Sequence, residues 1–182
     1  MLALERHPDS RGAEAVRIEV EARRPAPGVL ALRYLLQGGL SGLRLPPPAA
    51  PERTDELWRH TCFEAFAQIP GDDGYYEFNF APSSQWAVYR FTGHRAGMTA
   101  APLSSPPMIS GRHSSDGYEL EVRLDAGSLD QLPTFAAWRL GITAVIEDLG
   151  GAMSYWALVH PPGKPDFHHS DGFVAELTPT DL

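Results

Sequence analysis

Cysteine, long hydrophobic runs and basic charge are all scarce in this sequence. The single cysteine, Cys62, excludes an internal disulfide, a four-cysteine zinc site and a CxxCH haem attachment. No stretch approaches the roughly 18 apolar residues of a membrane span. The first residues also lack the basic and apolar regions of a signal peptide. We therefore expect a cytoplasmic protein with no membrane partner.

Positive charge is in the minority, with 15 Lys and Arg against 23 Asp and Glu and a formal net charge of −8. Nonspecific nucleic-acid binding depends on basic side chains that neutralise phosphates, so no nucleic-acid partner is expected. The rest of the composition, 43% hydrophobic and 21% charged, is typical of a globular domain. The length suits one domain, and we assign residues 1–182 to it.

Helical periodicity is nearly absent, and alternation with period two takes its place. Nine such segments follow one another with Pro, Gly and Ser between them: residues 16–22, 29–36, 63–69, 75–81, 86–91, 118–125, 138–146, 155–159 and 173–177. This pattern predicts an all-β fold, an antiparallel β-sandwich of about nine or more strands with little helix. A closed barrel is the alternative. The Pro-, Gly- and Ser-rich stretches 38–56 and 99–116 are expected to be long loops.

Two turns order the strands between residues 62 and 91. GDDG at 71–74 predicts that 62–69 pairs with 75–81, and PSSQ at 82–85 brings 86–91 back along 75–81. Counting from each turn places Phe66 opposite Asn79 and Glu77 opposite Arg90. Because side chains alternate, one face should be buried. With the later strands, the expected core includes Phe63, Tyr76, Phe78, Phe80, Tyr89, Phe91, Leu120, Val122, Leu140 and Ile142.

The opposite face of these strands mixes polar with aromatic side chains. It is expected to carry Glu64, Phe66, Gln68, Tyr75, Glu77, Asn79, Trp86, Val88 and Arg90. Carbohydrate-binding surfaces combine such groups, since rings stack on sugars and planar polar groups hydrogen-bond their hydroxyls. A solvated sheet face with a Glu77–Arg90 pair has the same pattern, and spacing alone favours that simpler interpretation slightly.

Several longer strings carry a family resemblance. LWRHTCFEAF at 57–66, YYEFNFAPS at 75–83, WAVYRF at 86–91 and RAGM at 95–98 resemble the bacterial DOMON-like family, which is similar to the family 9 carbohydrate-binding modules. AVIED at 144–148, SYWAL at 154–158 and HPPGKPDFHH at 160–169 agree with it. The resemblance covers nearly the whole chain and implies a DOMON-type β-sandwich, whose relatives bind sugars or haem.

Together, the polar face and the resemblance predict a non-catalytic binding domain for a carbohydrate or other small ligand. The expected ligand-binding residues are Trp58, Glu64, Glu77, Asn79, Trp86, Arg90, Arg95 and Trp156. No cofactor is expected, although analogy with the family allows calcium. Haem is not expected, because no pair of axial ligands for a haem iron is recognisable around Met98, Met108 or Met153 and no export signal is present.

Two other hypotheses concern function. Glu64 and Glu77 could serve as acid and base in a glycan-processing enzyme, since glycoside hydrolysis uses two carboxylates. No other signal in the sequence marks a catalytic residue. A structural or interaction domain with a vestigial ligand face is the second alternative.

A cluster near the end of the chain has the chemistry of a metal site. It contains His160, Asp166, His168 and His169, and imidazole with carboxylate suits zinc. However, the adjacent His168 and His169 would point to opposite sides of an extended chain. A loop held by hydrogen bonds at the rim of a pocket is therefore favoured, and no metal site is predicted.

Overall fold

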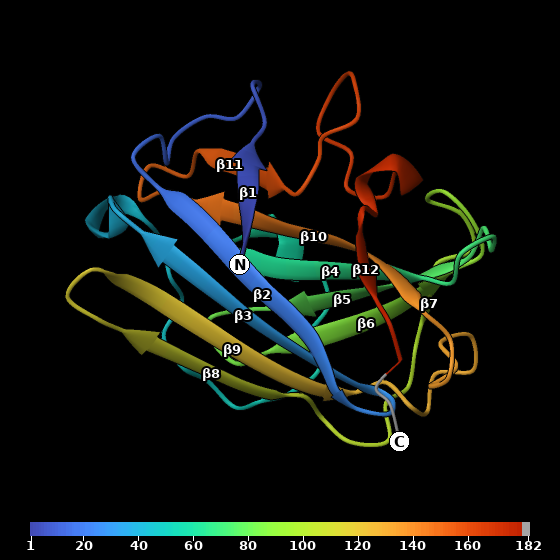
Figure 1. Cartoon of the computed structure of the whole chain (residues 1–182). Helices are drawn as coiled ribbons and strands as arrows, with labels where there is room; N and C mark the ends of the chain where they lie inside the picture. Colours follow the sequence, from blue (N-terminus) through green and yellow to red (C-terminus); the bar gives the residue numbers. More distant parts are fainter. Residues whose placement is uncertain (180–182) are drawn as a thin grey trace.

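The computed structural model describes residues 1–179 as two layers of antiparallel strands (Figure 1). Sheet A runs in the order β2 (Arg17–Ala26), β3 (Val29–Gln37), β9 (Gly117–Asp125) and β8 (Met108–His113). Sheet B runs in the order β7 (Thr99–Ala100), β6 (Trp86–Phe91), β5 (Tyr75–Phe80), β4 (Cys62–Gln68), β10 (Trp138–Glu147) and β11 (Met153–Ala157), and β12 (Ala175–Leu177) also pairs with β10. The fold is the predicted antiparallel β-sandwich.

One short strand joins the two layers. β1 (Leu2–Arg6) pairs with β2 through its first half and with β11 through Glu5 and Arg6. The two sheets are therefore one curled surface, continuous along this side and ending at β8 and β7. Helix is limited, within residues 1–179, to the 3-10 turns η1 (Leu40–Gly42), η2 (Leu57–Arg59) and η3 (Ser170–Gly172), and none of these could cross a membrane.

Sheet A is buried on one face only. Ile18 and Val20 of β2 are fully buried, while their neighbours along the strand are partly or fully exposed. On the solvent face, Arg33 of β3 pairs with Glu119 of β9, with 2.7 Å between Nε and Oε2. One-sided burial produces the regular alternation of polar and apolar residues from which these strands could be predicted.

Sheet B is buried on both faces, and every residue of β4 and β5 is buried. Its inner face packs against sheet A through the main core. Its outer face, the one turned away from sheet A, carries a second apolar cluster of Leu57, Cys62, Phe66, Tyr75, Ala81, Ala87, Tyr89, Phe91 and Phe173. The residues that cover this outer face come from η2 and from the chain segment after β11 (orange to red in Figure 1).

The register between β5 and β6 differs from the prediction by one residue. Glu77 pairs with Tyr89, and Arg90 pairs with Tyr76. The turn contains residues 81–85, one more than assumed, and Ser84 within it adopts a left-handed φ of 74°. A shift of one residue moves every side chain of a strand to the other face. The predicted placement of Arg90, Val88 and Trp86 beside Glu77 is therefore wrong.

The register between β4 and β5 differs by two residues, which leaves the faces unchanged. Glu64 lies opposite Asn79, and Phe66 lies opposite Glu77. Every predicted core residue is buried, but Tyr89 and Phe91 belong to the outer cluster and not to the inner core. The expected loop at 99–116 is interrupted by β7 and β8.

Candidate functional site

A cavity of about 390 Å³ opens on the outer face of sheet B. Three strands supply its floor, with Glu64 from β4, Glu77 from β5 and Val145 from β10. Its walls come from η2, from β6 and the connection after it, from β11 and from the segment after β11: Trp58, Phe91, Arg95, Met98, Tyr155, Pro165, Phe167 and His168. The cavity therefore brings together residues spread over more than half of the chain.

Two buried carboxylates form the polar centre of the floor. Glu64 is 2% exposed and Glu77 is 4% exposed. Glu64 Oε2 accepts a hydrogen bond of 3.2 Å from the Thr143 hydroxyl of β10. Glu77 Oε1 accepts one of 2.8 Å from the Asn79 amide. In both cases the partner is neutral, so neither carboxylate has a direct cationic partner in the sheet.

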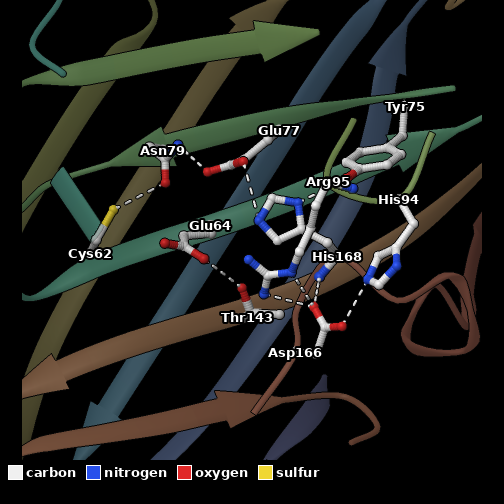
Figure 2. A network of polar contacts seen from close by, with 10 residues as sticks. All are labelled: Cys62, Glu64, Tyr75, Glu77, Asn79, His94, Arg95, Thr143, Asp166 and His168. Carbon is white, nitrogen blue, oxygen red and sulfur yellow. Dashed lines mark hydrogen bonds and ion pairs between the residues drawn. The ribbon is translucent and has the colours of Figure 1, made fainter. Parts of the chain in front are cut away.

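Asn79 is held in turn by the only cysteine. The amide is fully buried, and Cys62 Sγ lies 3.6 Å from its Oδ1, so the thiol donates to the amide oxygen and the amide NH2 donates to Glu77 (Figure 2). Burial and the nearby Glu64 raise the pKa of the Cys62 thiol well above its usual value, which keeps it protonated as a donor.

The protonation of the two carboxylates follows from their burial. Removal from water raises the pKa of Glu64 well above its usual value, and the charge of Glu77 raises it further. Burial also raises the pKa of Glu77 to about 7, although the Asn79 hydrogen bond and Arg95 oppose that shift. The floor can therefore offer carboxyl donors as well as carboxylate acceptors near neutral pH.

His168 extends the polar floor toward the cavity rim. Its Nε2 lies 3.8 Å from Glu77 Oε2, and its Nδ1 lies 2.8 Å from the Tyr75 hydroxyl (Figure 2). Tyr75 Oη accepts the backbone N–H of Arg95 at 3.1 Å, so we assign its own hydrogen to His168 Nδ1. Burial, with the charge of Arg95, lowers the pKa of His168 to about 4. The ring is therefore neutral at pH 7, with its proton on the Nε2 that faces Glu77.

Asp166 links the two segments that border the cavity. Its Oδ1 accepts Arg95 Nη2 at 2.8 Å, and its Oδ2 lies 2.8 Å from His94 Nε2. It also accepts the backbone N–H of His168. Burial works to raise the pKa of Asp166, but the hydrogen bonds from His94 and Arg95 outweigh it and lower that pKa. The guanidinium of Arg95 is thus already paired within the protein.

Aromatic rings form much of the remaining wall. Trp58 is half-buried and meets Tyr89 edge-on, with 5.7 Å between ring centroids. Tyr155 and Phe167 meet in the same way at 6.1 Å. Rings beside buried carboxylates offer both stacking faces and hydrogen-bonding groups to a small polar molecule.

The structure gathers part of the predicted site and disperses the rest. Trp58, Glu64, Glu77, Arg95 and the predicted rim residue His168 line the cavity. Two more predicted residues, Asn79 and Asp166, support it through their hydrogen bonds to Glu77 and Arg95.

The other predicted residues lie elsewhere. Trp86 is 8% exposed and belongs to the inner core, where Trp156 is also buried with its Nε1 bonded to Ser154. Arg90 lies over the ring of Tyr76 on the inner side of sheet B. They point away from the cavity because alternation along β6 and β11 sets their faces.

The predicted histidine cluster does not converge on one point. His160 bonds the Glu5 carbonyl through Nε2 and packs edge-on against His7, and His169 lies beside His94. Within residues 1–179, no group of three or more His, Cys, Asp or Glu side chains is arranged to hold a metal ion. His169 instead borders a second cavity of about 500 Å³, which shares His168 with the first.

Several contributors were missed by sequence reasoning. Thr143, Val145, Tyr155 and Phe167 were not expected at the site, although the last three lie inside the strings that carry the family resemblance. Phe91 was expected in the inner core. Correct strand register would have identified Phe91, since it follows Tyr89 by two residues on the face shared with Glu77.

Comparison with known proteins yields likenesses of fold. No family model matches the chain, and no curated protein matches its sequence. A solved structure from Bacteroides uniformis, provisionally assigned as a carbohydrate-binding protein, matches with a TM-score of 0.68 and 13% identity over 98% of this chain and 87% of the other.

Two further structures are of a family 9 carbohydrate-binding module from Caldicellulosiruptor kristjanssonii. The complex with glucose gives a TM-score of 0.54 at 10% identity, over 100% of this chain and 85% of the module. The complex with cellotriose gives 0.56 at 10% identity, over 99% and 84%. At such identities the likeness establishes the fold that these proteins share.

Proposed function

We propose that this chain is a non-catalytic binding domain for a carbohydrate, and that the cavity over Glu64 and Glu77 is its binding site. The observation that carries the proposal is the pairing of two buried carboxylates with aromatic walls in one open cavity. Burying a carboxylate costs stability unless something compensates it, so two in one cavity are best explained by a ligand that they bind.

The chemistry of the cavity suits a polyhydroxyl ligand. A sugar presents hydroxyl groups at its edges and C–H groups on its faces. The carboxyls of Glu64 and Glu77, with His168 Nε2, can hydrogen-bond the hydroxyls, while Trp58 and Tyr155 offer apolar surface to a ring face. The sugar-bound modules of the same fold support this proposal.

We also propose that the chain is a DOMON-like domain of bacterial type that acts in the cytoplasm. The strings at 57–66, 75–83 and 160–169 support the family assignment, and six of the residues in them line the cavity: Trp58, Glu64, Glu77, Pro165, Phe167 and His168. The proposed binding uses side chains alone and requires no cofactor.

A glycan-processing activity is the second candidate, and one observation favours it. Burial raises the pKa of Glu77 to about 7, which suits a general acid, and a second carboxyl lies in the same cavity. Release of reducing sugar from oligosaccharide substrates, abolished in Glu77→Gln, would identify the protein as an enzyme and contradict the binding proposal.

The binding proposal is tested by a thermal-shift screen over mono- and oligosaccharides, with and without calcium, followed by isothermal titration of each hit. We expect a saturable rise in melting temperature that is weakened in Glu77→Gln. The matched control is Glu14→Gln, which makes the same change at an exposed loop position. If no sugar stabilises the protein, or if both variants respond as the wild type does, the proposed site is wrong.

A further inference from the structure

The cavity contains more acidic than basic groups. Glu64, Glu77 and Asp166 face or border it, and Arg95 is the one arginine or lysine among its lining residues. Arg95 is already paired with Asp166, at 2.8 Å between Nη2 and Oδ1. The pair of floor carboxylates is therefore left without a cation of the protein in hydrogen-bonding contact.

Each floor carboxylate also has one oxygen that is free for a ligand. Thr143 bonds Glu64 Oε2, and Asn79 bonds Glu77 Oε1. Among residues 1–179, no hydrogen bond reaches Glu64 Oε1 or Glu77 Oε2, and His168 Nε2 lies 3.8 Å from the latter. Because both side chains line the cavity, these oxygens are open to an occupant.

The walls favour an occupant with positive charge as well. The electron-rich faces of tryptophan and tyrosine attract cations, most strongly where water is excluded. Trp58 and Tyr155 both line the cavity above the carboxylates. Aromatic walls over an acidic floor are typical of sites for amines and quaternary ammonium groups.

We propose, building on the proposed function, that the ligand is an amino sugar whose protonated amine binds the carboxylates of Glu64 and Glu77. The ammonium group supplies the missing cation and donates to the two open oxygens. The hydroxyls of the same molecule bond the remaining polar groups, and its ring packs against the aromatic walls. An acidic sugar is disfavoured, since its carboxylate would face both glutamates while Arg95 is engaged by Asp166.

Proton release accompanies this binding. Near pH 6 the raised pKa of Glu77 keeps its carboxyl protonated, and an arriving ammonium group favours the carboxylate, so the proton leaves to the buffer. The other titratable groups that face or adjoin these carboxyls are Tyr75, Arg95, Tyr155, Asp166, His168 and Cys62. A neutral sugar gives no such release.

The experiment compares glucosamine, glucose, N-acetylglucosamine and glucuronate by isothermal titration on the full chain at pH 6. We expect glucosamine to bind about tenfold or more tightly than glucose or N-acetylglucosamine. The reason is that the extra free energy of a hydrogen bond between charged groups, relative to a neutral one, corresponds to about that ratio of dissociation constants. Repeating the titration in two buffers of different ionisation enthalpy should show protons released with glucosamine alone.

Glu64→Gln keeps the size of the side chain and replaces a carboxyl that can ionise with an amide that cannot. We expect it to lower the affinity for glucosamine by more than it lowers the affinity for glucose, so that the preference for glucosamine is lost. The fold should survive, since Gln has nearly the same size as Glu and carries no charge, and Glu77→Gln provides a second test of the same preference. Glu14→Gln, with the same loss of charge outside the cavity, should behave as the wild type.

Equal binding of glucose and glucosamine, or tighter binding of glucuronate, would overturn the amino-sugar inference and leave the carbohydrate proposal standing. A calcium ion that competes with glucosamine and binds alone would overturn it in favour of a metal site. If none of the four sugars binds and the wider screen is also empty, both proposals fail together.

Discussion

Trp58 and Trp86 have the same side chain and opposite surroundings. Trp58 is half-buried in the cavity wall and makes a T-shaped ring contact with Tyr89, whereas Trp86 is 8% exposed in the inner core. The difference comes from the strand face and the loop on which each residue lies. Only Trp58 can offer a ring face to a ligand, so the two residues should differ in their effect on binding.

Trp58→Ala should weaken sugar binding about tenfold or more, because it deletes apolar area that the ligand covers. The melting temperature should fall only modestly, since the side chain is incompletely buried. Arg90→Ala serves as the control; it lies on the inner side of sheet B and should leave the dissociation constant unchanged. If isothermal titration showed that Arg90→Ala loses binding, Arg90 would have to face the cavity. That result would contradict the observed pairing of Arg90 with Tyr76.

At the scale of elements, the site depends on how the segment after β11 is held on sheet B. Phe173 is fully buried against the outer face, stacked with Phe66 at 5.7 Å between centroids. It fits there because β10 carries glycine at 141, where an added Cβ would lie 2.5 Å from the Phe173 ring. The same segment carries Phe167 and His168 into the cavity wall.

Gly141→Ala should therefore destabilise the protein by about 1–3 kcal/mol through overpacking and weaken binding by displacing the segment. Urea unfolding measures the first effect and titration the second. Gly42→Ala is the matched control, because no atom lies within 4 Å of its added Cβ. Wild-type stability and affinity in Gly141→Ala would mean that the contact between Gly141 and Phe173 does not hold the segment in place.

Replacing Asp166 should loosen the segments that border the cavity more than it lowers the stability of the whole fold. Asp166→Asn weakens the pairing with Arg95 and His94, which are exposed enough that each contributes less than about 1 kcal/mol to stability. We expect faster amide hydrogen exchange at residues 92–98 and lower affinity, with nearly unchanged global unfolding. Exchange unchanged at 92–98 would show that Asp166 does not hold these segments together.

At the scale of the whole molecule, the buried titratable groups set opposite pH dependences. The pKa of Glu77 is raised to about 7, so the folded state holds this proton more strongly than the unfolded state does. That contribution to stability is complete below about pH 4.5 and is lost as pH rises through 7. His168, whose pKa is lowered to about 4, costs stability as pH falls below about 6.5.

The stability of the free protein should therefore be greatest between about pH 5 and 6.5 and decline toward pH 8. In Glu77→Gln the alkaline decline should shrink, with a gain of about 2–3 kcal/mol at pH 8 relative to the wild type. Chemical unfolding at a series of pH values measures both curves. An unchanged decline in Glu77→Gln would mean that Glu77 does not resist ionisation in the fold.

The amino-acid sequence by itself determined the fold class and most strands. The strands of sheet A could be predicted because one face of the sheet is exposed to solvent, so polar and apolar residues alternate along Val16, Ile18 and Val20 and their neighbours. The carboxylates of Glu64 and Glu77 were also placed correctly on one face, because an error of two residues in pairing does not change the face.

Only the tertiary structure decided which aromatic residues join those carboxylates. Sheet B is buried on both faces, so alternation there does not distinguish inside from outside, and one extra residue in the 81–85 turn reversed the face of Trp86 and Arg90. Arg95 and His168 reach the cavity over Glu77 through loops whose paths depend on contacts such as Phe173 on Phe66. Such contacts join residues far apart in the chain, and local sequence patterns do not encode them.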